Sequence, residues 1–240
     1  MKTDYFAHDD VYKKLLAEGK VGWDETEQAY QRHKQQLREI LDSDLTPTSG
    51  KILELGCGAG NISIWLAQRG YEVTGVDISP TAVSWAEQKV RSENILVDFK
   101  VRDVLDLKDL DKNSFDIVLD GHCFHCIIGT DRFKFLSEAF RVLKPGGLFI
   151  VDTMCGPVKP GKIENYDHQT KCVYYNDLAV RYIGLPDDIR AEIKSAGFKI
   201  ITEQLRSDES NSDIIIQAVK PDKHKGSSSH CFSPVFYITD

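Results

Sequence analysis

Residues 51–79, "KILELGCGAGNISIWLAQRGYEVTGVDIS", contain the pattern that decides the fold. A short apolar run leads into three glycines within Gly56–Gly60, a helical pattern follows, and a second apolar run ends at Asp77. A strand, a tight glycine turn and a helix N-terminus form a nucleotide site, because glycine lets a ligand approach the main chain and the helix start offers unpaired N–H groups. An acid at the end of the second strand suits ribose hydroxyls. The segment therefore predicts a nucleotide-binding α/β fold.

The spacing of the glycines favours one class of nucleotide. A dinucleotide fingerprint needs a third glycine where Asn61 stands, so the pattern here is G-x-G-x-G. Glu54 also lies two residues before the first glycine. A carboxylate there does not help to bind an anionic pyrophosphate, but it suits a cationic ligand. S-adenosylmethionine (SAM) carries a sulfonium and an ammonium, so the charges favour SAM over a nicotinamide dinucleotide.

Strand and helix patterns alternate along the rest of the chain. This alternation predicts a parallel sheet with helices on both faces. A long stretch, 155–184, is expected to be irregular, and a helix and two strands follow it. The expected strands are 51–55, 71–77, 95–103, 115–121, 148–154, 199–205 and 213–220, and the expected helices are 61–70, 79–93, 132–143 and 186–198. "KPGG", residues 144–147, is expected to be a turn.

The motifs "ILELGCGAGN", "VTGVDIS", "VRDVLDL", "FDIVLD", "RVLKPGG" and "SAGF" occur in the order and spacing of class I SAM-dependent methyltransferases. The chain resembles that family over residues 48–155 and, through its last helix and strand pair, to about residue 219. The resemblance implies a three-layer Rossmann-like fold, with a seven-stranded, mostly parallel sheet whose last strand is antiparallel. It also implies SAM as cofactor, S-adenosylhomocysteine as product and no metal.

The resemblance assigns roles to individual residues. The glycine loop would lie beneath the methionine part of SAM, with Glu54 supporting it, and Asp77 would hold the ribose hydroxyls. Asp103 would bind the adenine amino group, although a carboxylate capping a strand end is the alternative for this residue alone. The implied cofactor-binding residues are Glu54, Gly56, Cys57, Gly58, Gly60, Asp77, Ile78, Asp103, Val104, Leu119, Asp120 and Gly121.

The loop after the fourth expected strand, "DGHCFHCII", is a candidate acceptor site. An imidazole suits proton transfer near neutral pH, so His122 and His125 are candidate general bases or substrate contacts. Cys123 and Cys126 are interpreted as packing residues, since a free thiol behaves as a small hydrophobe. A single C-x-x-C lacks the second pair of a structural zinc site, which ranks a metal or arsenic site last.

Two further segments are expected to shape the acceptor pocket. Residues 1–45 are polar and helical in character, and Trp23 within them is a candidate lid residue. The stretch 155–184 is long for a simple connection, and long loops are commonly functional. Its candidate substrate contacts are Tyr166, His168 and Arg181. We predict an N-terminal cap or lid at 1–45, a methyltransferase domain at 46–220 and a tail at 221–240.

Composition narrows the function further. The chain of 240 residues has a formal net charge of −7, and an acidic chain is poorly suited to contacts with nucleic-acid phosphates. The first residues lack a signal-like apolar segment, there is no apolar run long enough to span a membrane, and the six cysteines are unevenly spaced. We therefore expect a cytoplasmic monomer or homodimer that methylates a small molecule at oxygen, nitrogen or sulfur. The alternatives are a non-catalytic SAM-binding protein and, less favoured, an NAD-dependent oxidoreductase.

Overall fold

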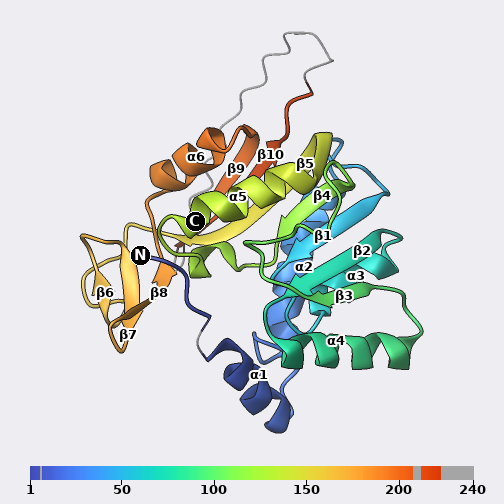
Figure 1. Cartoon of the computed structure of the whole chain (residues 1–240), viewed down its shortest axis with the longest axis horizontal. Coiled ribbons are helices and arrows are strands. Elements are labelled where there is room, and N and C mark those ends of the chain that lie inside the picture. Colours follow the sequence, from blue (N-terminus) through green and yellow to red (C-terminus); the bar gives the residue numbers. More distant parts are fainter. Residues whose placement is uncertain (6, 208–211, 223–240) are drawn as a thin grey trace.

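The core of the molecule is one seven-stranded sheet with helices on both faces (Figure 1). A computed structural model describes residues 1–5, 7–207 and 212–222. Most of the predicted tail, from residue 223 on, therefore lies outside the described residues. The sheet contains β1 (Lys51–Leu55), β2 (Glu72–Asp77), β3 (Asp98–Val101), β4 (Phe115–Asp120), β5 (Leu143–Cys155), β9 (Lys199–Ser207) and β10 (Ser212–Val219).

The strand order is β3-β2-β1-β4-β5-β10-β9, and β10 is antiparallel to both of its neighbours. The chain runs outward from β1 to β3 and then returns to place β4 on the other side of β1. Ligands of open α/β sheets bind where the strand order reverses in this way, outside the carboxyl ends of the strands. The order confirms the expected fold class and points to the carboxyl ends of β1 and β4 as the site.

The helices cover the two faces of the sheet, and alternation of side chains along each strand supplies both cores. On β1, Leu53 and Leu55 face the α5–α6 layer, whereas Ile52 faces α2 and α3. All three side chains are almost completely buried. The helices are α1 (His8–Ala17), α2 (Glu27–Leu41), α3 (Asn61–Gln68), α4 (Pro80–Glu93), α5 (Asp131–Val142) and α6 (Pro186–Ser195), with a short 3₁₀ turn, η1 (Phe124–Cys126).

The segment 144–147 departs from expectation. It is part of β5, which begins at Leu143, and the register against β4 shifts between Phe115 and Ile117. Gly146 has a φ of 78°, which only glycine adopts at little cost. The turn expected there is therefore an irregular start to the strand.

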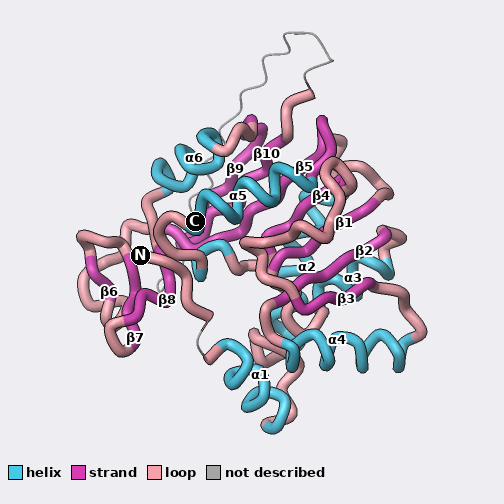
Figure 2. Tube along the Cα trace, viewed as in Figure 1, coloured by secondary structure: helices cyan, strands magenta, loops and turns pink. Residues whose placement is uncertain are grey.

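The stretch 155–184 is also more regular than expected. It contains a three-stranded antiparallel sheet, β6 (Tyr166–Asp167), β7 (Cys172–Tyr175) and β8 (Leu178–Tyr182), which lies at one side of the molecule (Figure 2). Asn176 and Asp177 connect β7 to β8 with φ values of 47° and 62°. Two consecutive positive φ angles are the mark of the two-residue turn that suits the twist of a hairpin. "YYNDLAV" is therefore the local signal for a hairpin in the sequence.

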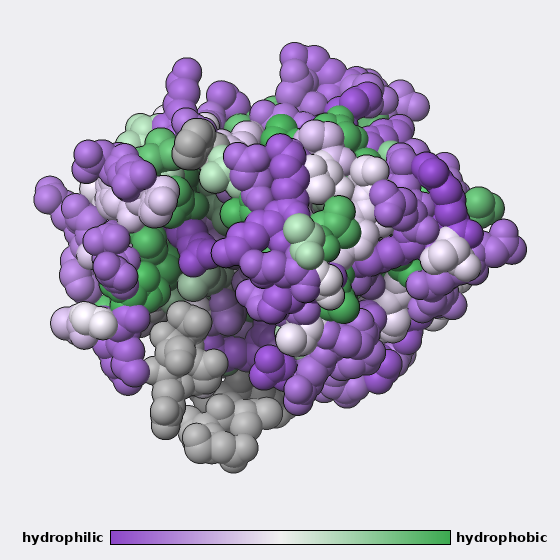
Figure 3. All heavy atoms as spheres, turned by 90° about the horizontal axis from the view of Figure 1, so that it is seen from below, coloured by the Kyte–Doolittle hydropathy of each residue, from purple (hydrophilic) through white to green (hydrophobic). Residues whose placement is uncertain are grey.

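The N-terminal residues pack against the sheet domain. Leu37, Ile40 and Leu41 of α2 join the core beside α3, and α1 packs against α4 through Tyr12, Leu15 and neighbouring side chains. The face seen in Figure 3 is mostly hydrophilic, with apolar side chains gathered in separate patches. In the described part of the chain, no helix is both long enough and apolar enough to cross a membrane.

Candidate functional site

A cavity of about 350 Å³ opens where the carboxyl ends of the central strands meet the N-terminal segment. Its volume is in the range of small-molecule pockets. Two groups of residues form its walls. We call the first the glycine-loop half, which consists of Glu54, Gly56, Cys57, Gly58, Asp77, Ile78, Val104 and Gly121, and the second the histidine half, which consists of Arg32, His33, His122, His125, Asp152, Arg181 and Arg206.

The glycine loop turns sharply beneath the cavity. Gly56 and Gly58 have φ values of 76° and 52°, and the backbone N–H groups of Gly56 and Cys57 both donate to the carbonyl of Val76, at 2.8 and 3.0 Å. A Cβ on Gly121 would lie 2.7 Å from the carbonyl oxygen of Gly56. Glycine at these positions thus keeps two backbone segments in contact and open to a ligand.

Asp77 holds the glycine loop and the start of α4 together. Its carboxylate accepts hydrogen bonds from the backbone N–H of Gly58 and of Ser79, both at 2.9 Å. Burial nevertheless raises the pKa of Asp77 above its usual range. Each carboxylate oxygen has a second lone pair. Two hydroxyl groups can therefore bind to Asp77 without displacing either backbone contact.

Glu54 is a buried acid at the end of β1. Its Oε2 accepts a hydrogen bond from the Ser63 hydroxyl on α3. Burial, with the nearby Asp77 adding to it, raises the pKa of Glu54 to about 8. A cation in the cavity would stabilise the ionised form of both acids. The glycine-loop half thus fits a cationic nucleoside such as SAM, since it offers carboxylates and a glycine-lined wall.

Four predicted cofactor residues do not belong to the described lining of the cavity. Gly60 begins α3 and packs on Phe99, and Leu119 is buried within the sheet. Asp120 accepts hydrogen bonds from the backbone of Cys123 and Phe124, and burial raises its pKa to about 6. These three residues belong to the framework around the cavity, and Asp120 holds the loop after β4. The fourth, Asp103, has a partner of its own.

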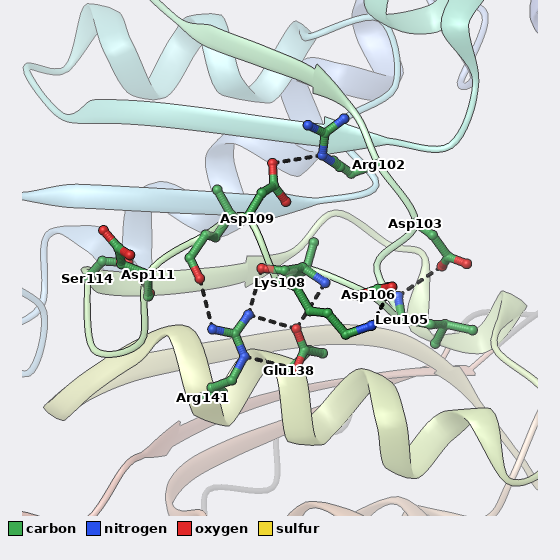
Figure 4. Close-up of polar contacts among 12 residues, drawn as sticks. Arg102, Asp103, Leu105, Asp106, Lys108, Asp109, Asp111, Ser114, Glu138 and Arg141 are labelled. Carbon is green, nitrogen blue, oxygen red and sulfur yellow. Dashed lines mark hydrogen bonds and ion pairs between the residues drawn. The ribbon is translucent and has the colours of Figure 1, made fainter.

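Asp103 accepts hydrogen bonds from the Tyr5 hydroxyl at 2.8 Å and from the Leu105 backbone at 2.9 Å. It lies in the loop after β3, beside Val104, which does line the cavity. Figure 4 shows how α5 holds this loop. Arg141 donates to the carbonyls of Leu107 and Leu110, and Glu138 accepts from the Leu107 backbone.

The N-terminal segment covers the glycine-loop half. Tyr5, His8, Tyr12 and Trp23 all line the cavity. The indole of Trp23 stacks on His8 and lies against Tyr12, with ring centroids 5.8 and 5.3 Å apart. Asp9 caps the start of α4, where it accepts from the Ser79 hydroxyl at 2.6 Å. This arrangement is that of a cover over the site, in agreement with the position proposed for Trp23.

His122 stands at the centre of the histidine half. Its Nδ1 is 3.0 Å from the backbone carbonyl of Asp152 and 4.0 Å from the carboxylate of the same residue. A carbonyl only accepts, so Nδ1 carries the proton, and in the neutral ring Nε2 is left with a lone pair. His122 also has a φ of 66°, a costly conformation for a side chain of this size. The loop therefore holds an imidazole with a free basic nitrogen.

Two further imidazoles lie beside His122. The rings of His125 and His33 are 4.7 and 6.5 Å away. Burial lowers the pKa of both, that of His125 strongly, so both are neutral near pH 7. His33 Nε2, His125 Nδ1 and Arg206 Nε are buried without a hydrogen-bond partner in the described structure. Arg206 binds both carboxylate oxygens of Asp152 through another nitrogen.

The sequence did not single out His33, Asp152 or Arg206, which come from α2, β5 and β9. Of the predicted substrate contacts, Arg181 lines the cavity from β8. Tyr166 and His168 instead pair with each other on the small sheet, and the Tyr166 hydroxyl donates to the Ile183 carbonyl. They are outside the described lining, because the hairpin orders a stretch that was expected to be an irregular pocket loop.

The cysteines of the "HCFHC" loop have free thiols. Burial raises the pKa of Cys126 to about 11 and raises the pKa of Cys123 well above its usual range. Both thiols are thus protonated near neutral pH, as packing residues would be. Among the residues that the structure describes, no group of three His, Cys, Asp or Glu side chains could hold a metal ion.

Known proteins resemble this chain in sequence and in fold. The family described as a methyltransferase domain matches residues 53–151. The match covers less than half of the chain and indicates a domain of the class I SAM-dependent methyltransferase type. The chain is 36% identical over 107 residues to the "Putative methyltransferase YqeM" of Bacillus subtilis, and the match covers 44% of this chain and 43% of that protein. A fold of this type implies SAM as cofactor.

Two other similar proteins differ in their described reaction and in how much of this chain they cover. A "S-adenosyl-L-methionine-dependent Diels-Alderase" of Talaromyces variabilis is 36% identical over 110 residues, and the match covers 43% of this chain and 36% of the relative. A SAM-dependent methyltransferase of Methanosarcina mazei has a similar structure, with a TM-score of 0.64, 24% identity, and coverage of 74% of this chain and 95% of that one. The chain thus spans less than half the length of the two curated relatives.

Proposed function

We propose that this protein transfers a methyl group from SAM to a small-molecule acceptor bound in the histidine half, with His122 as general base. The observation that carries the proposal is the 3.0 Å contact between His122 Nδ1 and the Asp152 carbonyl, from which we infer that Nδ1 carries the proton. The free Nε2 is a proton acceptor in a cavity whose other wall suits SAM. An oxygen, nitrogen or sulfur acceptor that must lose a proton fits this site.

When bound, SAM supplies an electrophilic methyl group on its sulfonium. The glycine loop and Asp77 hold the cofactor end of the cavity, and the N-terminal cover limits access of water to it. His122 Nε2 would take the proton from the acceptor atom while that atom displaces S-adenosylhomocysteine from the methyl carbon, so that the carbon–sulfur bond breaks as the new bond forms. The Asp152 carboxylate, 4.0 Å from Nδ1, stabilises the imidazolium that results.

A protein of this fold that binds SAM without methyl transfer is the second candidate. The "Diels-Alderase" among the relatives favours keeping it, because that name describes a different reaction with the same cofactor. In such a protein the histidine half would bind a substrate without deprotonating it for methylation. In that case, replacement of His122 would weaken substrate binding and would have no effect on methyl transfer.

Calorimetry with SAM and S-adenosylhomocysteine tests the first step. We expect saturable binding of both, and an Asp77→Ala variant should weaken it because the Asp77 carboxylate holds the backbone of Gly58 and Ser79. Release of S-adenosylhomocysteine from SAM, measured against a panel of hydroxy, amino and thiol compounds, tests the second step. Binding without any methylated product across the panel would favour the second candidate, and absence of binding at millimolar ligand would end both.

A further inference from the structure

The histidine half contains more hydrogen-bond donors than the protein uses. Three arginines, Arg32, Arg181 and Arg206, line it, and a guanidinium group donates hydrogen bonds but never accepts them. In the described part of the chain, Arg206 is the one of the three with a carboxylate partner, Asp152. The guanidinium groups of Arg32 on α2 and Arg181 on β8 form no hydrogen bond or ion pair with the described residues, and both side chains are exposed at the edge of the cavity.

The acids of the same region do not balance these donors. Asp152 is held by Arg206, and Asp213, which also lines the cavity, has an interaction of its own. Asp24, a third carboxylate of the lining, belongs to the N-terminal cover and acts on Tyr12, Tyr30 and His33. Among the described residues, none of these carboxylates forms an ion pair with Arg32 or Arg181.

The histidine half also contains buried nitrogen atoms that lack a hydrogen-bond partner. Arg206 Nε is a donor only, and it is buried without a partner in the described structure. His33 Nε2, a donor or an acceptor according to the tautomer of its neutral ring, also lacks a hydrogen-bond partner in the described structure, since it lies 3.7 Å from the Asp152 carboxylate. Buried polar atoms of native proteins almost always have a partner, so such orphans point to a missing ligand. A ligand that satisfies donors must be rich in acceptor oxygens.

We propose that the acceptor substrate carries an oxyanion, a carboxylate or a phosphate, that binds Arg181 and the neighbouring donors of the histidine half. This proposal rests on the proposed function, because it concerns the acceptor side of the same cavity. Arg181 acts on both His125 and Cys126 in the loop after β4, which places its charge beside the imidazole cluster. The oxyanion would thus fix the acceptor with its nucleophilic atom toward His122. A guanidinium binds such a group through two parallel hydrogen bonds.

The first test measures anion binding without turnover. The full chain is saturated with S-adenosylhomocysteine and titrated with sodium acetate or inorganic phosphate, against sodium chloride at equal ionic strength. The side-chain Nε–H signals of arginine are followed by NMR, and Arg181→Gln assigns the signal of Arg181. We expect a saturable shift of that signal with acetate or phosphate, and the anion that saturates at lower concentration identifies the preferred oxyanion.

The second test uses turnover. Hydroxy acids and hydroxyalkyl phosphates are compared with their neutral amides and alcohols as methyl acceptors. We expect kcat/KM to favour the anionic member by about ten- to a hundredfold, the worth of one charge-assisted hydrogen bond. Arg181→Gln should remove most of that preference through KM. Arg91→Gln is the matched control, since Arg91 is exposed on α4 and pairs only with Glu87.

Two outcomes would overturn the proposal. One is that the Arg181 signal shows no saturable response to either anion while S-adenosylhomocysteine still binds. The other is that neutral acceptors react as well as their anionic partners in the wild-type chain. The comparison of anionic with neutral acceptors needs only the wild-type protein, so it decides the matter even if Arg181→Gln fails to fold. Failure of the proposed function itself looks different, because S-adenosylhomocysteine would then not bind, or it would bind while neither the anionic nor the neutral acceptors were methylated.

Discussion

In the glycine-loop half of the cavity, the polar groups already have partners within the protein, whereas in the histidine half several do not. Asp77 accepts two backbone hydrogen bonds, and Glu54 accepts one from Ser63. Across the cavity, His33 and Arg206 leave buried nitrogen atoms unpartnered in the described structure. A wall that completes its own hydrogen bonds can be rigid before any ligand arrives. A wall with spare donors depends on a ligand to complete it.

This contrast separates two kinds of variant. Changes in the glycine-loop half should act on cofactor affinity, and changes in the histidine half should act on turnover of the acceptor. A variant of one half that changed mainly the property assigned to the other half would contradict this distinction. Three experiments probe it, and their expected effects decrease in order.

Replacement of His122 by alanine should have the largest effect. Loss of a general base lowers turnover by about 10²- to 10⁴-fold, while affinity for S-adenosylhomocysteine should stay within about threefold. Steady-state kinetics and calorimetry on the same preparation measure both. His168→Ala is the control, because His168 lies on the small sheet away from the cavity lining. If His122→Ala weakened cofactor binding more than it slowed turnover, His122 would belong to the cofactor wall.

Replacement of Asp77 by alanine should have an intermediate effect of the opposite kind. It removes acceptors for two backbone N–H groups and for the ribose hydroxyls, so affinity for SAM should fall by about 1–3 kcal/mol. Titration calorimetry measures this, with circular dichroism to show that the variant is folded. Asp98→Ala, at an exposed position on β3, should bind normally. Unchanged affinity in a folded Asp77→Ala protein would mean that ribose binds elsewhere.

The smallest expected effect is release of part of one proton on SAM binding. Glu54 has a pKa of about 8 in the free protein, so near pH 7 its carboxyl group is mostly protonated. A bound cation favours the carboxylate and lowers this pKa, which releases the proton and makes affinity rise with pH up to about 8. Calorimetry in buffers of different ionisation enthalpy counts the protons. Glu54→Gln should abolish the release, and Glu72→Gln, exposed on β2, should not. Proton uptake by the wild type would contradict the assignment.

Features that depend on residues close together in the sequence were predicted correctly more often than features that depend on residues far apart. The glycine loop and Asp77 are separated by few residues, and parallel strands bring them together in any fold of this class. By contrast, Asp103 fits the family pattern, yet Tyr5, far away in the sequence, occupies one of its oxygens. The hairpin at Asn176 had a local signal that turn chemistry could have identified.

By itself, the sequence determined the fold class, the family and the wall that suits SAM, because periodicity, glycine spacing and neighbouring acids act over short distances along the chain. Only the tertiary structure decided the acceptor wall. His33, Asp152, Arg181 and Arg206 come from a helix, two strands of the main sheet and the small sheet. No spacing in the sequence joins them, since long-range packing brings them together. The unpartnered nitrogen atoms of His33 and Arg206 can be identified only in the folded structure, because burial removes the water that would otherwise bind them.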